Sequence, residues 1–164
     1  MYKFVIDSDA LIKLTKTGLL EQVCRHYNCA ITSEVKEESV DEGKKRFYKD
    51  ALKIEELIGK KLLKVIELKK AKSIKGNFGK GEVSSISLYF QEKNSTLVTD
   101  DSAFIRYLEE ENVSFILPAD IILLMKRSEE IDEKTALDYL EKMKHFIREE
   151  VYNDVKKDIK EAKK

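Results

Sequence analysis

The sequence predicts an α/β protein with three layers, α/β/α, around a mostly parallel five-stranded sheet. Two observations favour this class. Short apolar segments of strand length alternate along the chain with longer segments whose apolar residues recur at helical spacing. Strands that alternate with helices form parallel sheets, and such strands are buried on both faces, so they appear in a sequence as uninterrupted apolar runs.

Five segments have the length and composition of these buried strands. They are "YKFVI", "CAIT", "LLKVIEL", "STLVT" and "VSFIL", at residues 2–6, 29–32, 62–68, 95–99 and 113–117. The last one is stopped by Pro118, because proline cannot donate a backbone hydrogen bond to a neighbouring strand.

Helices are expected in the intervals between the strands. Residues 10–27 predict two short helices interrupted near Gly18, and Ser33 is expected to cap the helix after the second strand. Further helices are expected over residues 46–60, where Phe47 and Ala51 share an apolar face, from Glu82, over 102–112, and from Ala119 onward with a break near 128–132. The last dozen residues, "NDVKKDIKEAKK", are expected to fray as a solvated tail.

The length of 164 residues suits one domain, which we expect to span residues 1–164. Its core is expected at about residues 2–125, followed by a C-terminal helical extension at about 126–164. The 31 Lys and Arg residues balance the 31 Asp and Glu residues, which argues against a uniformly basic surface but leaves room for local patches.

Cellular location is constrained by what the sequence does not contain. No segment approaches the roughly 18–20 apolar residues of a membrane span, and only three apolar residues separate Lys3 from Asp7, too few for a signal peptide. Cys24 and Cys29 cannot build a disulfide framework or a four-ligand zinc site, so we expect buried thiols. A cytoplasmic protein without membrane contact is expected.

Carboxylates follow the predicted strands at the points where each strand ends. Parallel strands bring their carboxyl ends to one edge of the sheet, where ligands bind in open α/β folds. The first strand leads into Asp7 and Asp9, and the fourth into Asp100 and Asp101. Two further segments, "SEVKEES" and "GKGE", contribute Glu34, Glu37, Glu38 and Glu82.

Clustered carboxylates repel one another, so either some are protonated or a cation lies among them. Oxygen ligands alone select hard cations such as Mg²⁺ or Mn²⁺, which can polarise a phosphate oxygen and lower the pKa of a bound water. A histidine general base is not expected, because His26 and His145 lie in helical segments away from the strand ends.

Several of these acids also have structural interpretations. Asp9 can cap the first helix, Glu82 can be a first-turn acid favoured by the helix dipole, and one of Asp100 and Asp101 can be an N-cap. Asp7 has the weakest structural interpretation, because nothing near it in the sequence is expected to need a cap from it.

Four motifs carry a resemblance to a known family. "FVIDSDALIKL", "ITSEVKEES", "GKGEVSSISLY" and "LVTDDSAF" occur in the order and at the spacing of PIN-domain proteins, over roughly residues 2–125. PIN-domain proteins are Mg²⁺- or Mn²⁺-dependent nucleases, of which the VapC-type toxins are the largest group. The resemblance implies a PIN-like fold, and it implies four catalytic acids, Asp7, Glu38, Glu82 and Asp101, with Glu37 as the alternative to Glu38.

The resemblance also implies how these residues work together. Metal binding falls to Asp7, Glu82 and Asp101 with Asp100 as an auxiliary acid, and Thr99 can orient a carboxylate of the first strand. Asp9 departs from the family pattern, which commonly has a small polar residue there. This extra acid can either strengthen metal binding or only cap a helix.

By the same resemblance, the substrate is RNA, either single-stranded or in the loop of a folded RNA. A metal-activated water would attack the phosphodiester in line and leave 5′-phosphate and 3′-hydroxyl ends. A homodimer is implied, and so is a cognate antitoxin if the protein is the toxin of a toxin–antitoxin pair.

A lysine-rich segment precedes Glu82. Residues 60–80 contain eight lysines and one acid, Glu67. Lysines beside an acidic metal site can neutralise the flanking phosphates of a substrate, although a solvated surface segment would have the same composition. The RNA-contacting residues expected here are Lys69, Lys70, Lys72, Lys75 and Lys80.

Two alternatives remain open at this point. The Asp7-x-Asp9 spacing also occurs in haloacid-dehalogenase-like phosphatases, but "VTDDSAFIR" lacks the glycine and the spaced second acid of their later motif. The other alternative is a PIN-like module that binds RNA or a protein without turnover.

Overall fold

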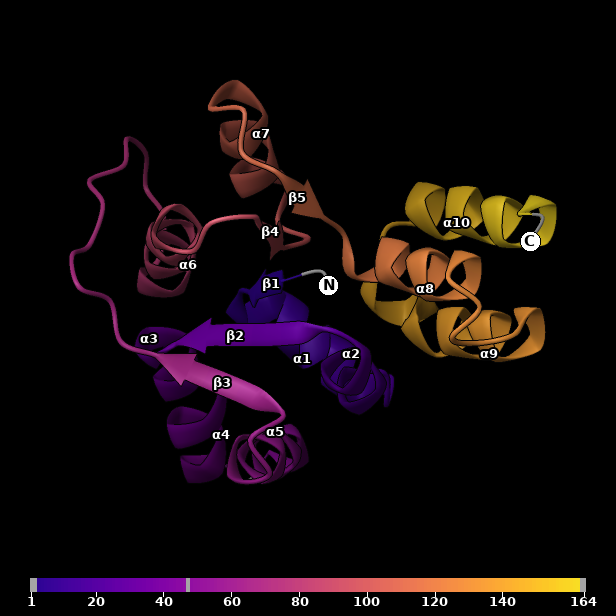
Figure 1. Ribbon diagram of the computed structural model, residues 1–164, viewed down its shortest axis with the longest axis horizontal. Helices are drawn as coiled ribbons and strands as arrows, with labels where there is room; N and C mark the ends of the chain where they lie inside the picture. The colour runs from indigo at the N-terminus through magenta and orange to yellow at the C-terminus, as the bar shows by residue number, and fades with distance from the viewer. Residues whose placement is uncertain (1–2, 47, 163–164) are drawn as a thin grey trace.

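The computed structural model describes residues 3–46 and 48–162, and within these it has a five-stranded parallel sheet (Figure 1). The strands pair in the order β3-β2-β1-β4-β5, and every pair is parallel. Their bounds are β1 (Lys3–Ile6), β2 (Asn28–Thr32), β3 (Leu63–Ile66), β4 (Ser95–Val98) and β5 (Phe115–Ile116). The predicted fold class is confirmed.

The helices fill the intervals between the strands, as predicted. They are α1 (Ser8–Lys16), α2 (Leu20–His26), α3 (Ser33–Lys36), the π-helical turn η1 (Glu37–Asp41), α4 (Glu42–Lys45), α5 (Lys49–Gly59), α6 (Lys80–Gln91), α7 (Ser102–Glu110), α8 (Pro118–Arg127), α9 (Glu133–Met143), the 3₁₀ turn η2 (Lys144–Phe146) and α10 (Glu149–Glu161). Gly18 separates α1 from α2 with φ of +75°, a conformation that favours glycine. None of the described helices is long and apolar enough to cross a bilayer.

The two faces of the sheet pack against different helices because successive strand residues point to opposite sides. Phe4 and Ile6 of β1 join the larger core cluster, which contains buried residues of α1, α2, α5 and the helices from α8 to α10. Val5 points the other way and packs with Leu88 of α6. Helices α6 and α7 share a further core cluster with Leu97 of β4. The result is the three-layer arrangement.

Two local expectations are wrong. Thr32 rather than Ser33 caps α3, since the Thr32 hydroxyl accepts a hydrogen bond from the Val35 backbone N–H at 3.1 Å. The C-terminal segment is helical up to Glu161 and is not a frayed tail. Helix α10 buries Tyr152, Val155 and Ile159, which share one helical face.

Other expectations have mixed outcomes. Cys24 and Cys29 are free and buried, as expected. The predicted strand start at Tyr2, the predicted helical residue Phe47 and the last two lysines of the C-terminal segment lie outside the described residues.

The loop at residues 67–79, between β3 and α6, is anchored although it has no regular structure (Figure 1). The ring of Phe78 lies 5.4 Å from the rings of both Phe104 and Tyr107, measured between centroids. Ile74 packs against the same cluster. These contacts fix the point at which α6 begins, and that point lies at the candidate site.

Candidate functional site

The register of the sheet places Asp7 beside Thr99. Strands β1 and β4 pair with Ile6 opposite Val98, so the next residue of each strand lies at the same carboxyl edge. The Asp7 backbone N–H donates to the Val98 carbonyl at 3.1 Å. Both side chains are buried, and Asp7 is only 1% exposed.

Asp7 is the N-cap of α1, contrary to the expectation that nothing local needs a cap from it. Its Oδ1 accepts a hydrogen bond from the Ala10 backbone N–H at 2.8 Å. Asp9 is therefore not the cap and lies in the first turn of the helix. The other oxygen of Asp7, Oδ2, is buried and has no hydrogen-bond partner of normal geometry among the described residues.

The environment of Asp7 raises the pKa of its carboxyl group to about 7. Burial is the main cause, because it disfavours the charged form. The Thr99 side chain and the Ala10 N–H oppose this by stabilising the carboxylate, while the charges of Asp9 and Glu82 raise the pKa further. An acid that is buried beside other acids is the kind of group that a bound cation would keep ionised.

A cavity of about 130 Å³ opens beside Asp7, and we call it the acidic pocket. Its lining residues come from the start of α1, from η1 and from the turn that begins α6: Asp7, Ser8, Asp9, Glu38, Gly79, Gly81 and Glu82. Three segments that are distant in the sequence therefore bring four carboxylates to one small cavity.

Glu38 is held in the acidic pocket by two hydrogen bonds. Its Oε2 accepts from the Ser8 hydroxyl at 2.5 Å, and its Oε1 accepts from the Gly81 backbone N–H at 3.1 Å. Glu37, the alternative left open by the sequence, lines a different cavity together with Lys36. The geometry favours Glu38 as the second acid of the site.

Gly81 allows this close approach of α6 to the Glu38 carboxylate. A Cβ atom at this position would lie 2.7 Å from Glu38 Oε2 and 2.9 Å from the Ser8 Oγ, closer than such atoms normally come. Ser8 and Gly81 were not predicted as site residues, although the glycine before Glu82 in "GKGE" indicates a close backbone contact.

Glu82 lines the acidic pocket and lies close enough to Asp101 to feel its charge. Its Oε2 accepts from the Gly79 N–H at 3.3 Å. Burial raises the pKa of Glu82, the charge of Asp101 raises it further, and Glu38 and Asp9 add to the effect. Asp101 does not line the pocket. It caps α7, with its Oδ1 accepting from the Phe104 N–H at 2.8 Å.

Lys13 pairs with the two auxiliary acids. Its Nζ lies 2.7 Å from Asp100 Oδ2 and 3.0 Å from Asp9 Oδ2. Burial lowers the pKa of Lys13, but the hydrogen bonds to Asp100 and Asp9 outweigh it, so the net shift is upward. Lys13 was not predicted as a site residue, although its position four residues after Asp9 places both side chains on one helix face.

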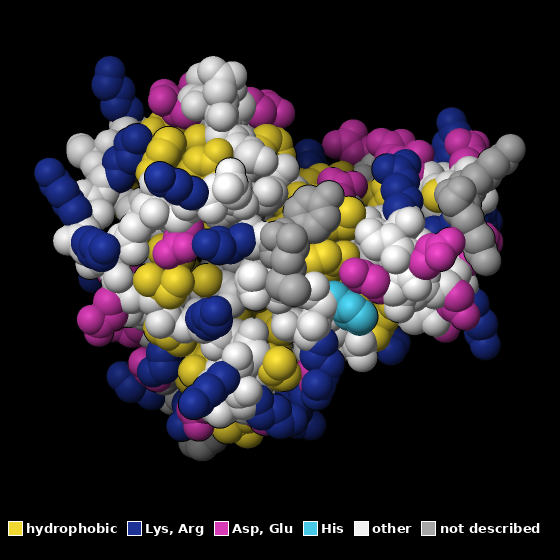
Figure 2. All heavy atoms as spheres, in the orientation of Figure 1, with side chains coloured by type: hydrophobic (Ala, Val, Ile, Leu, Met, Phe, Trp, Pro, Cys, Tyr) yellow, Lys and Arg dark blue, Asp and Glu magenta, His cyan; other side chains and the backbone are white. Residues whose placement is uncertain are grey.

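The five lysines that the sequence singled out for RNA contact are all exposed. Figure 2 shows lysine and arginine side chains projecting at the left of the view, where Figure 1 places the 67–79 loop. Lys69, Lys70 and Lys72 line a common cavity, Lys75 lies further along the loop, and Lys80 begins α6.

The residues of the acidic pocket fit a hard divalent cation by their chemistry. Within residues 3–46 and 48–162, no three His, Cys, Asp or Glu side chains already stand close enough together to hold a metal ion. The charged oxygen ligands are nevertheless all carboxylates, and Asp7 offers a buried oxygen that has no hydrogen-bond partner of normal geometry in the described part of the chain. Such a set suits Mg²⁺ or Mn²⁺.

Comparison with protein families decides the membership of this chain. A family model described as a PIN domain (DUF3368) matches residues 3–161. The chain belongs to the PIN-domain family. The match continues through α9 and α10, so these helices lie within the matched PIN domain. No curated protein and no solved structure matches the chain.

The PIN domain is a nuclease-type fold, and its members commonly cleave nucleic acids and generally use divalent metals. Membership favours this interpretation over a haloacid-dehalogenase-like phosphatase. It also makes the acidic pocket, at the carboxyl edge of this PIN domain, the place to look for a divalent metal.

Proposed function

We propose that this PIN domain is a metal-dependent endoribonuclease that hydrolyses RNA phosphodiester bonds with Mg²⁺ or Mn²⁺. The observation that carries the proposal is the convergence of Asp7, Glu38 and Glu82 on one small pocket, where a buried Asp7 oxygen has no hydrogen-bond partner of normal geometry among the described residues. Asp101 lies near enough for its charge to raise the pKa of Glu82.

In this proposal Asp7, Glu38, Glu82 and Asp101 would hold the divalent ion. A bound ion of this kind polarises a phosphate oxygen and lowers the pKa of a water nucleophile. The protein itself fixes the acids: the Ala10 N–H holds one oxygen of Asp7, and the Gly81 N–H with the Ser8 hydroxyl holds Glu38.

Positive side chains then reduce the repulsion that an RNA backbone would meet at this edge. Lys13 neutralises charge on Asp9 and Asp100, so these two acids act as support for the site. The exposed lysines of the 67–79 loop attract phosphates that flank the bond to be cleaved.

Cleavage of a labelled single-stranded RNA with Mn²⁺ or Mg²⁺, and its loss in EDTA, tests the proposal directly. Asp7→Asn should abolish cleavage and weaken Mn²⁺ binding measured by calorimetry, while the fold is retained. Asp154→Asn is the matched control, since Asp154 is an exposed acid of α10. Full activity of the Asp7 variant would show that the site is misassigned.

The same assay separates the alternatives. A phosphatase would hydrolyse p-nitrophenyl phosphate and trap a phosphoryl group on Asp7, whereas the proposed nuclease does neither. A PIN module without turnover would bind RNA and leave it intact at every metal concentration.

The resemblance to VapC-type toxins extends the proposal to a homodimeric toxin with a cognate antitoxin. Induced expression of the wild-type chain should then arrest growth while the Asp7→Asn variant does not, and light scattering should give the mass of a dimer. Normal growth with an active nuclease would assign the enzyme to ordinary RNA processing.

A further inference from the structure

A second cavity, of about 630 Å³, lies between the 67–79 loop and the end of α6. Three lysines, Lys69, Lys70 and Lys72, line it together with the ring of Phe90. We propose that this cavity, the Phe90 subsite, binds one nucleobase of a single-stranded RNA by stacking on Phe90 while the lysines contact the adjacent phosphates. The inference rests on the proposed function only in one respect, that the bound single-stranded RNA is also the substrate.

Phe90 is exposed where an apolar side chain of α6 would normally be buried. It is 49% exposed, whereas Ile86 and Leu88 of the same helix are fully buried. Lys72 Nζ lies 3.5 Å from the centroid of the Phe90 ring, and the Tyr89 ring meets it edge-on at 5.1 Å. The Lys72 ammonium therefore covers one face of this half-exposed ring, and a base that stacks on that face would displace the ammonium toward the adjacent phosphate.

Hydrogen bonds hold the lysines around this ring. The Lys72 backbone N–H donates to the Ser87 hydroxyl at 2.8 Å, and the Lys69 N–H donates to Gln91 Oε1 at 3.2 Å. Both acceptors belong to α6, so this part of the loop is attached to the helix that carries Phe90. The backbone of Lys69 and Lys72 is thus held beside α6 before a ligand binds, and their side chains start close to the ring.

The charges of the subsite favour a polyanion. Of the described residues that line it, three are lysines and none is acidic. The cavity that holds the exposed rings of Tyr48 and Phe146 differs, because its three cations are balanced by three acids, Glu38, Glu42 and Asp50. An aromatic ring surrounded by lysines is typical of surfaces that bind single-stranded nucleic acid by base stacking.

The subsite also lies at a useful distance from the acidic pocket. Phe90 follows Glu82 by eight residues on α6, which corresponds to about 12 Å along the helix axis, a span of roughly two to four nucleotides. A base held at Phe90 would anchor the strand a few nucleotides from the bond to be cleaved.

Fluorescence anisotropy with a labelled single-stranded oligoribonucleotide, in EDTA so that no cleavage occurs, tests the subsite. Phe90→Leu should weaken binding by about 5- to 150-fold, the range expected for loss of one stacked base. Phe90→Trp should bind as tightly as the wild-type chain. Both variants should keep the wild-type circular dichroism spectrum, since the side chain is half exposed.

Phe146→Leu is the matched control, because Phe146 is also an exposed ring beside a lysine, with Lys16 Nζ 5.4 Å from its centroid. It should bind RNA normally. Unchanged binding by Phe90→Leu, a loss by Phe90→Trp as large as that of Phe90→Leu, or an equal loss in the Phe146 variant would overturn the inference.

Cleavage measured separately with Mn²⁺ keeps the two proposals apart. If the Phe90 dependence of binding is found in a chain that never cleaves RNA, the subsite stands and the nuclease proposal fails. If the wild-type chain cleaves RNA and Phe90→Leu changes neither binding nor KM, the subsite alone fails.

Discussion

The two oxygens of the Asp7 carboxyl group lie in different environments. One oxygen caps α1, and the other is buried at the acidic pocket without a hydrogen-bond partner among the described residues. The cap is compatible with either protonation state, whereas a buried negative charge is unfavourable without a cation. The same residue should therefore limit the stability of the metal-free protein and be needed for its activity.

Asp7→Asn should stabilise the metal-free protein at pH 8 more than at pH 5. With a native pKa of about 7 and an ordinary value of 3.8, the native state keeps its proton to higher pH than the unfolded chain. The resulting penalty is absent below about pH 4, grows as the pH rises and is complete above about pH 7. Asparagine avoids it and still offers a cap oxygen.

Denaturant unfolding in EDTA measures this effect. The stabilisation by Asp7→Asn should be larger at pH 8 than at pH 5 by on the order of 2–3 kcal/mol. An equal effect at both pH values would show that Asp7 is already ionised in the metal-free native state.

Gly81→Ala should reduce RNA cleavage while the protein stays folded. Alanine is the better helix former by about 1 kcal/mol, but its Cβ would push the Glu38 carboxylate away from Ser8 and the Gly81 N–H. A misplacement of a catalytic group by about 1 Å can lower the reaction rate by about 100-fold. Thermal unfolding and cleavage rates, measured together, test this.

Gly59→Ala is the control for this substitution, since a Cβ at Gly59, at the end of α5, would meet nothing within 4 Å. It should leave cleavage unchanged. Wild-type cleavage by Gly81→Ala would mean that the position of Glu38 does not matter for the reaction.

Among the elements, α1 depends on Lys13 for its attachment to the end of β4. Lys13 is 17% exposed and its partner Asp100 only 4%, so this ion pair is largely shielded from water. Lys13→Gln should destabilise the protein by about 2–3 kcal/mol, because Asp100 would be left as an unpaired buried charge. Adding Asp100→Asn should restore much of the loss. Denaturant unfolding of both variants measures this, and additive losses would contradict the pairing.

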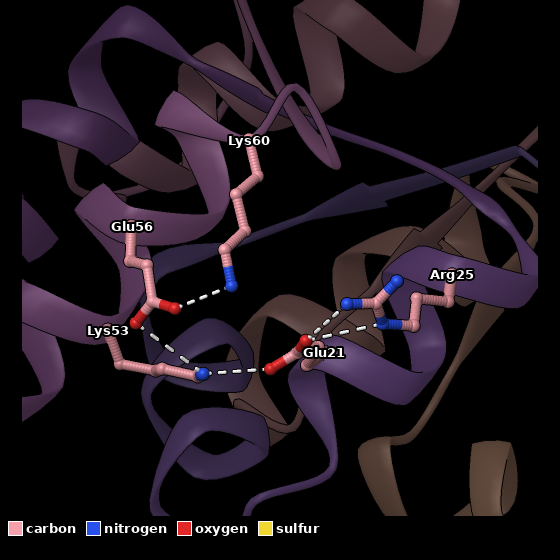
Figure 3. A network of polar contacts seen from close by, with 5 residues as sticks. All are labelled: Glu21, Arg25, Lys53, Glu56 and Lys60. Atoms are coloured by element: carbon pink, nitrogen blue, oxygen red, sulfur yellow. Dashed lines mark hydrogen bonds and ion pairs between the residues drawn. The ribbon is translucent and has the colours of Figure 1, made fainter.

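A network of surface ion pairs joins helices α2 and α5 (Figure 3). Glu21 accepts hydrogen bonds from Arg25 and Lys53, and Lys53 also approaches Glu56, which pairs with Lys60. The hydrogen bonds from Lys53 and Arg25 lower the pKa of Glu21 to about 2. These pairs are at least partly exposed and are screened by salt, so buried residues such as Ile54 and Leu57 contribute more to the packing of α5.

Local sequence patterns predicted most of the strands and helices. The strands were predictable because each contains a short run of mainly apolar residues, and the break at Gly18 was predictable from its residue type. The caps were harder to assign. Thr32 and Ser33 both suit an N-cap, and α1 begins directly after Asp7 without a loop, so the strand-end acid itself became the cap.

The whole molecule accounts for what the sequence could not predict. The pairing of Lys13 with Asp100, the bond between Ser8 and Glu38, and the exposure of Phe90 depend on how distant segments meet in the folded chain. The C-terminal helices are a similar case. Val155 and Ile159 lie among many charged residues in the sequence, and their shared apolar face was recognised only from the packing of α10 onto the core.

Acids from separate segments meet at the carboxyl edge of the sheet, and we propose that they hold a divalent ion there. A crystal of the protein soaked in Mn²⁺, with anomalous scattering recorded, tests it most directly. We expect a manganese peak in the acidic pocket, about 2.0–2.3 Å from an oxygen of Asp7 and from at least one of Glu38, Glu82 and Asp101. A fully occupied peak elsewhere, or no peak in this pocket at saturating Mn²⁺, would contradict it.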